Sequence, residues 1–223
     1  MTVPVPPLTR MVLWAQFLAG ACLEPGDLAV DLTAGSGRDT LFLWQQVAPT
    51  GSVVSIDIQP AALAETTSRL ESAGAPVHSP LQAGATFPSG PGIYPVVACH
   101  SRFGEFLPAA PKVIFANLGF HPGGDRQLVT RPETTLAALQ AAARHLLPGG
   151  RLLVAVYPGH PGGREEAAVV GTWFAALSPH GWETLQLQLP NRAQAPFLLL
   201  AERRGAGQGA RLVVKGLDSN VVK

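Results

Sequence analysis

Cysteine is scarce in this sequence: its 223 residues include only Cys22 and Cys99. Two cysteines cannot supply the disulfide framework that holds small secreted domains together. No group of cysteines and histidines has the spacing of zinc ligands either. We therefore predict a protein without a bound metal ion, folded in the reducing cytoplasm.

Charged residues are also few. They make up 14% of the chain, and 16 basic against 15 acidic residues leave a net charge of +1. This balance excludes the strongly basic surface that announces many nucleic-acid binders, so any contact with nucleic acid must depend on a local patch. Hydrophobic residues make up 47% of the chain. That content favours one compact globular domain with a sizeable core.

Long hydrophobic runs are missing as well. The best candidate is residues 11–23, MVLWAQFLAGACL, which is shorter than the roughly 20 apolar residues that cross a membrane. The run follows Arg10 and resembles the apolar part of an export signal, but Gln16 interrupts it and it leads directly into a turn and a strand. We favour a buried helix over residues 9–23, with Leu13, Phe17 and Ala21 on its inner face.

The most informative segment that is present is residues 28–40, LAVDLTAGSGRDT. An apolar run ends in Asp31, a loop of small residues follows, and a helix can start near Arg38. This order of strand, glycine turn and helix opens many nucleotide-binding α/β domains. Gly35 and Gly37 lack a Cβ atom, so the backbone can turn tightly and a ligand can approach it closely.

Two classes of ligand use such a turn. A dinucleotide places its pyrophosphate there, but the third glycine position of that motif is Thr40, and Asp31 and Asp39 would repel a phosphate. S-adenosylmethionine (SAM) has no phosphate and carries an ammonium and a sulfonium group, so the two acids favour a methyl donor over NAD. An ordinary strand-to-helix turn stays an alternative, because a lone glycine pair is a weak signal.

Strands and helices alternate along the rest of the chain. We predict strands at 28–31, 53–56, 96–99, 112–116, 151–157, 182–189 and 197–202, with helices at 38–47 and 60–73, from Pro132 to 148, and around Val169, Trp173 and Leu177. This pattern predicts an α/β class I methyltransferase Rossmann-like fold: a seven-stranded, mostly parallel sheet, helices on both faces and a terminal antiparallel hairpin. We expect one domain over residues 1–204 with a loop insertion at 74–95, and a mobile tail at 205–223.

Polar side chains follow the predicted strands, at the edge where ligands bind in open α/β sheets. They are Asp31, Asp57, His100, Ser101, Asn117 and His160. Asp57 lies about 20 residues beyond the glycine turn, where an acid accepts hydrogen bonds from ribose hydroxyls. A helix-capping role for Asp57 is the alternative.

Five motifs, in order, carry a family resemblance: DLTAGSGRDTLFL, SIDIQ, NLGFHPGGDR, TTLAAL and AVYPGHPGG. Over roughly residues 11–204, without 75–93, the chain resembles small bacterial class I SAM-dependent methyltransferases formerly called rRNA methylases. Characterised members of that family methylate the aminomethyl group of 5-aminomethyl-2-thiouridine at the wobble position of tRNA. The resemblance implies SAM as cofactor, the tRNA anticodon loop as partner and a homodimer.

The resemblance also implies roles for single residues. Those that would surround SAM are Asp31, Ala34, Gly35, Ser36, Gly37, Asp39, Thr40, Asp57, Ile58, Gln59, His100, Ser101 and Asn117. Those that would hold the acceptor amine are Asn117, Leu118, Gly119 and Phe120. The sequence departs from the family at three of these motif positions: Ser36 stands where Asn is usual, Arg38 where His is usual, and Phe120 where Tyr is common.

Three residues are candidates for a general base: His121, Asp125 and His160. Each also has a structural interpretation, and a base is not required if the amine loses its proton to water before binding. For the RNA patch we select Arg126 and Arg131, with Arg164 and Arg192 as further members, although scattered arginines are usually solvated surface. Two other functions stay open: methyl transfer to rRNA or to a small amine, and ligand binding without catalysis.

Overall fold

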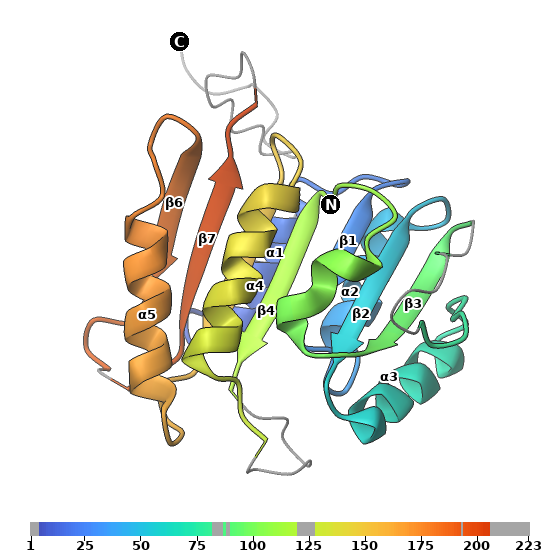
Figure 1. Ribbon diagram of the computed structural model, residues 1–223, viewed down its shortest axis with the longest axis horizontal. Coiled ribbons are helices and arrows are strands. Elements are labelled where there is room, and N and C mark those ends of the chain that lie inside the picture. Colours follow the sequence, from blue (N-terminus) through green and yellow to red (C-terminus); the bar gives the residue numbers. More distant parts are fainter. Residues whose placement is uncertain (1–4, 82–86, 88–89, 120–127, 193, 206–223) are drawn as a thin grey trace.

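The computed structural model describes residues 5–81, 87, 90–119, 128–192 and 194–205. Its strands are β1 (Leu28–Asp31), β2 (Ser52–Asp57), β3 (Gly92–Val97), β4 (Val113–Leu118), β5 (Arg151–Val156), β6 (Trp182–Leu187) and β7 (Phe197–Arg203). They form one sheet in the order β3-β2-β1-β4-β5-β7-β6 (Figure 1). Strands β1 to β5 are parallel to one another, whereas β7 is antiparallel to both of its neighbours, β5 and β6. The predicted fold class is confirmed.

Helices cover both faces of the sheet. They are α1 (Met11–Gly20), α2 (Arg38–Val47), α3 (Pro60–Ser72), the 3-10 helix η1 (His100–Phe106), α4 (Pro132–His145) and α5 (Gly163–Ala175). Helices α1, α2 and α3 pack into one buried cluster, and η1, α4 and α5 pack into the other, on the opposite face (Figure 1). Consecutive strand residues serve the two clusters alternately: Ala29 and Phe115 face one, and Val30 and Ile114 face the other.

The buried face of α1 differs from the predicted one. Met11, Ala15 and Ala19 are at most 5% exposed, whereas Ala21 is exposed and Leu13 and Phe17 are only half-buried. Both stripes have helical spacing, and α1 is apolar nearly all round, so periodicity cannot choose between them. The small alanine side chains allow the helix to lie close to the sheet, and this packing selects the stripe.

Helix α5 shows the same kind of shift. Val170 and Phe174 form its buried stripe, and the predicted Val169 and Trp173 are only partly buried. The buried stripe continues to a charged residue, Glu166, which is 1% exposed. An acid on the inner face of a helix runs against the hydrophobic pattern, so the sequence favoured the neighbouring stripe.

The loop insertion ends earlier in the chain than predicted. Strand β3 begins at Gly92, not at Val96, so the last four residues of the 74–95 segment belong to the sheet. Pro95 is tolerated because β3 is an edge strand. The described part of the insertion packs along this edge: Val77 pairs with Ile93, and the His78 ring stacks on Tyr94 at 4.2 Å between centroids. Of the predicted tail at 205–223, residues 206–223 lie outside the described residues.

Gly37 is required by the turn before α2. Its φ is +76°, and a Cβ atom there would lie 2.9 Å from Cα of Thr66 in α3. We expect Gly37→Ala to lower the free energy of unfolding by about 1–3 kcal/mol, from backbone strain and overpacking together. Urea denaturation measures this change.

Gly171 supplies the matched control for that substitution. It lies inside α5, and a Cβ atom there would meet no atom within 4 Å. Gly171→Ala should therefore leave the stability unchanged or raise it by up to about 1 kcal/mol, the difference in helix propensity. Equal effects of the two alanines would show that the turn does not need glycine at residue 37.

Candidate functional site

The glycine turn between β1 and α2 is held by backbone bonds and by β2. The Ala34 N–H donates to the Ile56 carbonyl at 2.8 Å, and the Gly35 N–H donates to Oδ2 of Asp57 at 2.9 Å. Thr66 of α3 donates its hydroxyl to the Gly35 carbonyl at 3.0 Å. The ends of β1 and β2 and the flank of α3 therefore form one rigid unit at the carboxyl edge of the sheet, where a ligand is expected.

Asp31 is a completely buried carboxyl group at the end of β1. Its Oδ2 accepts the Thr40 hydroxyl at 2.7 Å, and its Oδ1 accepts the Thr33 N–H at 3.1 Å. Burial, and then the nearby Asp39, raise the pKa of Asp31 to about 7, against the lowering effect of these hydrogen bonds. A cation bound nearby would stabilise the charged form of this carboxyl group and lower its pKa again.

Asp39 connects the start of α2 to two distant elements. Its Oδ1 accepts from Nε2 of Gln16 and its Oδ2 accepts from Nδ2 of Asn117, both at 2.7 Å. Burial raises the pKa of Asp39, and these two hydrogen bonds act in the opposite direction. Gln16 was not predicted as a site residue. The signal was the polar side chain inside an otherwise apolar helix.

Asn117 is oriented by these contacts. A carboxylate only accepts hydrogen bonds, so the amide nitrogen of Asn117 faces Asp39 and the amide oxygen faces the other way. This Oδ1 is buried and has no hydrogen-bond partner among the described residues. The backbone N–H of Asn117 donates to Oγ1 of Thr33 at 2.8 Å, which joins the end of β4 to the glycine turn. The site therefore presents a fixed acceptor oxygen beside Asp31 and Asp39.

Asp57 lies at the end of β2, and its carboxylate can accept more hydrogen bonds than the described residues supply. Its two oxygens accept the N–H groups of Gly35 and Gln59, each at 2.9 Å. A carboxylate has about four lone-pair positions, so two are left for ligand hydroxyls. The next residue, Ile58, is 57% exposed. An acid followed by an exposed apolar side chain can hold a ribose and border a flat base.

His100 and Ser101 begin η1, after β3. Burial lowers the pKa of His100, and the charge of Asp57 opposes this shift, so the imidazole lies within electrostatic reach of the ribose candidate. The Ser101 hydroxyl lies 3.2 Å from Sγ of Cys99. The structure brings both residues to the same edge as Asp57; their contact with adenine stays a prediction.

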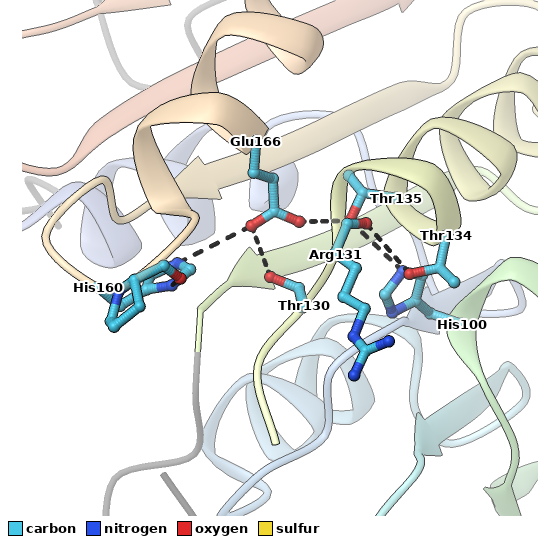
Figure 2. A network of polar contacts seen from close by, with 8 residues as sticks. His100, Thr130, Arg131, Thr134, Thr135, His160 and Glu166 are labelled. Carbon is cyan, nitrogen blue, oxygen red and sulfur yellow. Dashed lines mark hydrogen bonds and ion pairs between the residues drawn. The ribbon is translucent and has the colours of Figure 1, made fainter. Parts of the chain in front are cut away.

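The acceptor side is only partly described. Leu118 ends β4 and Gly119 follows it, but Phe120, His121, Asp125 and Arg126 lie outside the described residues. Arg131 is exposed at the start of α4. The side chain of His160 is 4% exposed, and its Nε2 lies 3.9 Å from Oε2 of Glu166, in the network that Figure 2 shows. Glu166 was not predicted as a site residue.

A hollow of about 360 Å³ adjoins His160. Its walls come from the β5–α5 connection, the first turn of α5 and the β6–β7 connection: Pro158, Gly159, His160, Gly162, Arg164, Glu165 and Gln194. The volume lies in the range of small-molecule sites. His160, Arg164, Glu165 and Gln194 give the hollow polar groups for a polar acceptor, and the His160 ring also lies near Gly119.

The described residues contain no candidate metal site and no membrane-spanning helix. Among them, no group of three or more His, Cys, Asp or Glu side chains could hold a metal ion. No helix in the described part of the chain is long and apolar enough to cross a membrane.

The chain is similar in sequence and structure to known methyltransferases. A relative from Arabidopsis thaliana, named tRNA (mnm(5)s(2)U34)-methyltransferase, chloroplastic, is 36% identical over 200 residues, which cover 86% of this chain and 67% of the relative. A solved structure described as a "putative rRNA-methylase", from Clostridium thermocellum, is 27% identical with a TM-score of 0.77, and the match covers 91% of this chain and 100% of that one.

A second solved structure bears on the cofactor. It is described as a "putative methyltransferase" from Streptococcus mutans in complex with SAH, the demethylated product of SAM, and it is 25% identical with a TM-score of 0.73 over 87% of this chain and 98% of that one. The family model described as "Putative rRNA methylase" matches residues 53–202. The chain belongs to this family, and it is a methyltransferase that uses S-adenosylmethionine as its cofactor.

Proposed function

We propose that this enzyme transfers the methyl group of SAM to the aminomethyl nitrogen of 5-aminomethyl-2-thiouridine at the wobble position of tRNA. The name of the Arabidopsis relative supports this acceptor. The observation that carries the proposal is the buried Oδ1 of Asn117, which lies beside the glycine turn and has no partner in the described part of the chain. An amine acceptor brings N–H groups that this oxygen can receive. The free thiols of Cys22 and Cys99 fit the cytoplasm as the place of action.

The described residues fit SAM. Asp31 and Asp39 supply the negative field that its ammonium and sulfonium groups need, and the charge of Arg38 offsets that of Asp39 only in part. Asp57 has two lone-pair positions left for ribose hydroxyls, and Ile58 offers an apolar surface for adenine. The replacement of the usual asparagine by Ser36 does not disturb the turn, because its contribution is a backbone carbonyl that Arg69 binds at 2.5 Å.

When bound, SAM supplies a methyl carbon that is already strongly electrophilic, so the protein mainly has to orient the acceptor. Asn117 accepts an N–H of the uncharged amine at Oδ1, which turns the nitrogen lone pair away from the amide. Asp39 prevents the amide from rotating, because its carboxylate requires the NH₂ group. The wobble base lies in a single-stranded loop, so its presentation costs less than flipping a paired base.

A reconstituted reaction tests this acceptor. Purified enzyme and SAM are incubated with tRNA that carries 5-aminomethyl-2-thiouridine, with ribosomal RNA, and with a free primary amine. Mass spectrometry of the nucleosides should show one added methyl group at the wobble uridine and none in the other samples. If only rRNA or only the free amine receives a methyl group, that molecule is the acceptor and the proposed one is wrong. Binding of SAM without transfer to any acceptor would favour a non-catalytic role.

The arginine patch gives a separate prediction for RNA binding. Replacing Arg126 and Arg131 together by alanine should weaken tRNA binding and reduce the slope of log affinity against log salt by about two, because each phosphate contact releases counterions. Filter binding at several salt concentrations measures both. Arg102 provides the control: it is exposed and already pairs with Glu105 at 2.6 Å, so Arg102→Ala should leave the slope unchanged. An unaltered slope in the double variant would show that these two arginines do not contact tRNA phosphates.

The raised pKa of Asp31 predicts that SAM affinity depends on pH. With a pKa of about 7 in the free enzyme, the carboxyl group is largely protonated below pH 7. A bound cation favours the carboxylate and lowers this pKa, so binding releases a proton and affinity must rise with pH. We expect the dissociation constant to increase about tenfold per pH unit below 7 and to level off above it.

Calorimetry in buffers of different ionisation enthalpy measures the proton release. Asp31→Asn cannot titrate, so it should bind SAM more weakly and with a flat pH profile over the same window. A wild-type profile that is equally flat would mean that the SAM cation does not interact with Asp31.

A further inference from the structure

Glu166 is a buried acid that the donor site does not use. It lies in the first turn of α5 and is 1% exposed. Its Oε2 accepts the Thr130 hydroxyl at 2.7 Å, and its Oε1 accepts the Thr135 hydroxyl at 2.6 Å. Hiding a carboxylate with hydroxyl partners alone is costly, because its charge loses the solvation of water. A role beyond these two hydrogen bonds would explain why an acid occupies this buried position.

The remaining neighbour of the carboxylate is His160. Nδ1 of His160 lies 2.9 Å from the Pro161 carbonyl oxygen, which can only accept, so Nδ1 carries the proton. Nε2 faces Oε2 of Glu166 at 3.9 Å and has no hydrogen-bond partner in the described parts of the chain, so a second proton on Nε2 would make this contact an ion pair between imidazolium and carboxylate. Figure 2 shows the carboxylate between His160 on one side and Thr130 and Thr135 on the other.

The imidazole of His160 lies against two glycines. A Cβ atom on Gly163 would come within 2.9 Å of the ring, and one on Gly119 within 3.7 Å. Gly119 follows β4 two residues after Asn117, and its carbonyl accepts the Thr130 N–H at 2.9 Å. The ring therefore lies between the 360 Å³ hollow and the segment that presents the Asn117 oxygen.

We infer that Glu166 is a positioning residue for the acceptor: it fixes the His160 ring as a wall of the hollow that receives the modified nucleoside. The Glu166 carboxylate accepts hydrogen bonds from Thr130, beside the end of β4, and from Thr135, at the start of α4. Its third contact is the ion pair that it would form with the imidazolium of His160 in the β5–α5 connection. Through Thr135, whose hydroxyl lies 3.5 Å from Nε2 of His100, the network also reaches η1. The inference rests on the proposed methyl transfer to a wobble nucleoside.

Glu166→Gln tests the charge while keeping the size and the ability to bond to hydroxyls. We expect kcat for methyl transfer to tRNA to fall about tenfold or more, because misalignment acts on the reacting pair. The dissociation constant of SAM should stay within twofold, and the midpoint of thermal unfolding should not fall, because a buried charge is removed. Glu133→Gln is the matched control: it changes an exposed first-turn glutamate of the neighbouring α4 and should leave kcat unchanged.

A double-mutant cycle separates positioning from general support of the fold. If Glu166 acts through His160, the Glu166→Gln, His160→Ala double variant should be no slower than the slower single variant. Losses that multiply would overturn the inference, as would a Glu166→Gln enzyme with wild-type kcat or with SAM affinity lost in proportion to rate. Should Glu166→Gln fail to fold, Thr130→Val and Thr135→Val each remove one hydroxyl from the carboxylate, and both must lower kcat without altering SAM affinity.

The cycle also distinguishes the inference from the proposed function. Failure of the proposed acceptor shows in the wild-type enzyme, which would then transfer no methyl group to tRNA. Failure of the inference leaves the wild-type enzyme active on tRNA, whichever of the overturning results the Glu166 variants give.

Discussion

Asn117→Ala is expected to lower kcat/KM for methyl transfer about a hundredfold while the dissociation constant of SAM changes by only a few-fold. The substitution removes the buried oxygen that has no partner among the described residues, and with it the group that orients the acceptor amine. A displacement of about 1 Å between reacting atoms can cost on the order of a hundredfold in rate. SAM binding depends mainly on the turn and on Asp57, which the substitution leaves in place.

Single-turnover transfer to tRNA, with SAM affinity measured in parallel, tests this result. Gln16→Ala is the appropriate comparison, because Gln16 and Asn117 donate to the two oxygens of the same carboxylate at the same distance, 2.7 Å. It disturbs Asp39 in the same way but leaves the Asn117 oxygen in place, so its rate should fall by much less. If Asn117→Ala loses SAM affinity in proportion to rate, Asn117 binds the donor and does not orient the acceptor.

Asp57→Ala should weaken SAM binding by about 1.5–3 kcal/mol, which is roughly tenfold to 150-fold, the usual scale for hydrogen bonds to a charged group. Two effects act in the same direction. The variant loses the lone pairs proposed for the ribose hydroxyls, and it frees the Gly35 N–H, whose bond to Oδ2 holds the glycine turn against β2. The loosened turn should add to the loss.

Calorimetry with SAM and with its demethylated product measures this change, and both ligands should be affected equally because they share the ribose. Asp27→Ala is the control: Asp27 also accepts a backbone N–H, that of Glu24 at 2.8 Å, but it precedes β1, at the opposite edge of the sheet. It should bind SAM as the wild type does. An equal loss in both variants would point to reduced stability, and no loss in Asp57→Ala would place the ribose elsewhere.

The sequence by itself determined the fold class and the edge that carries the site. Apolar runs alternating with helical segments permit few topologies, and parallel strands joined by helices bring their carboxyl ends to one edge. Asp31, Asp57 and Asn117 could therefore be placed together from their positions at strand ends, and the structure joins them through the turn. The glycine turn could also be predicted, because Gly35 and Gly37 between a strand and a helix indicate a tight turn, and both have the positive φ that favours glycine.

Only the tertiary structure decided which faces are buried and which polar groups meet. On α1 and α5 two stripes have the same helical spacing, and the shape of the surface opposite each helix selects Ala15 and Val170. The pairing of Gln16 with Asp39, and of Glu166 with His160, joins residues from separate elements. A hydrogen bond depends on distances of a few tenths of an ångström, and the hydrophobic pattern of a sequence does not encode distances between side chains of different elements.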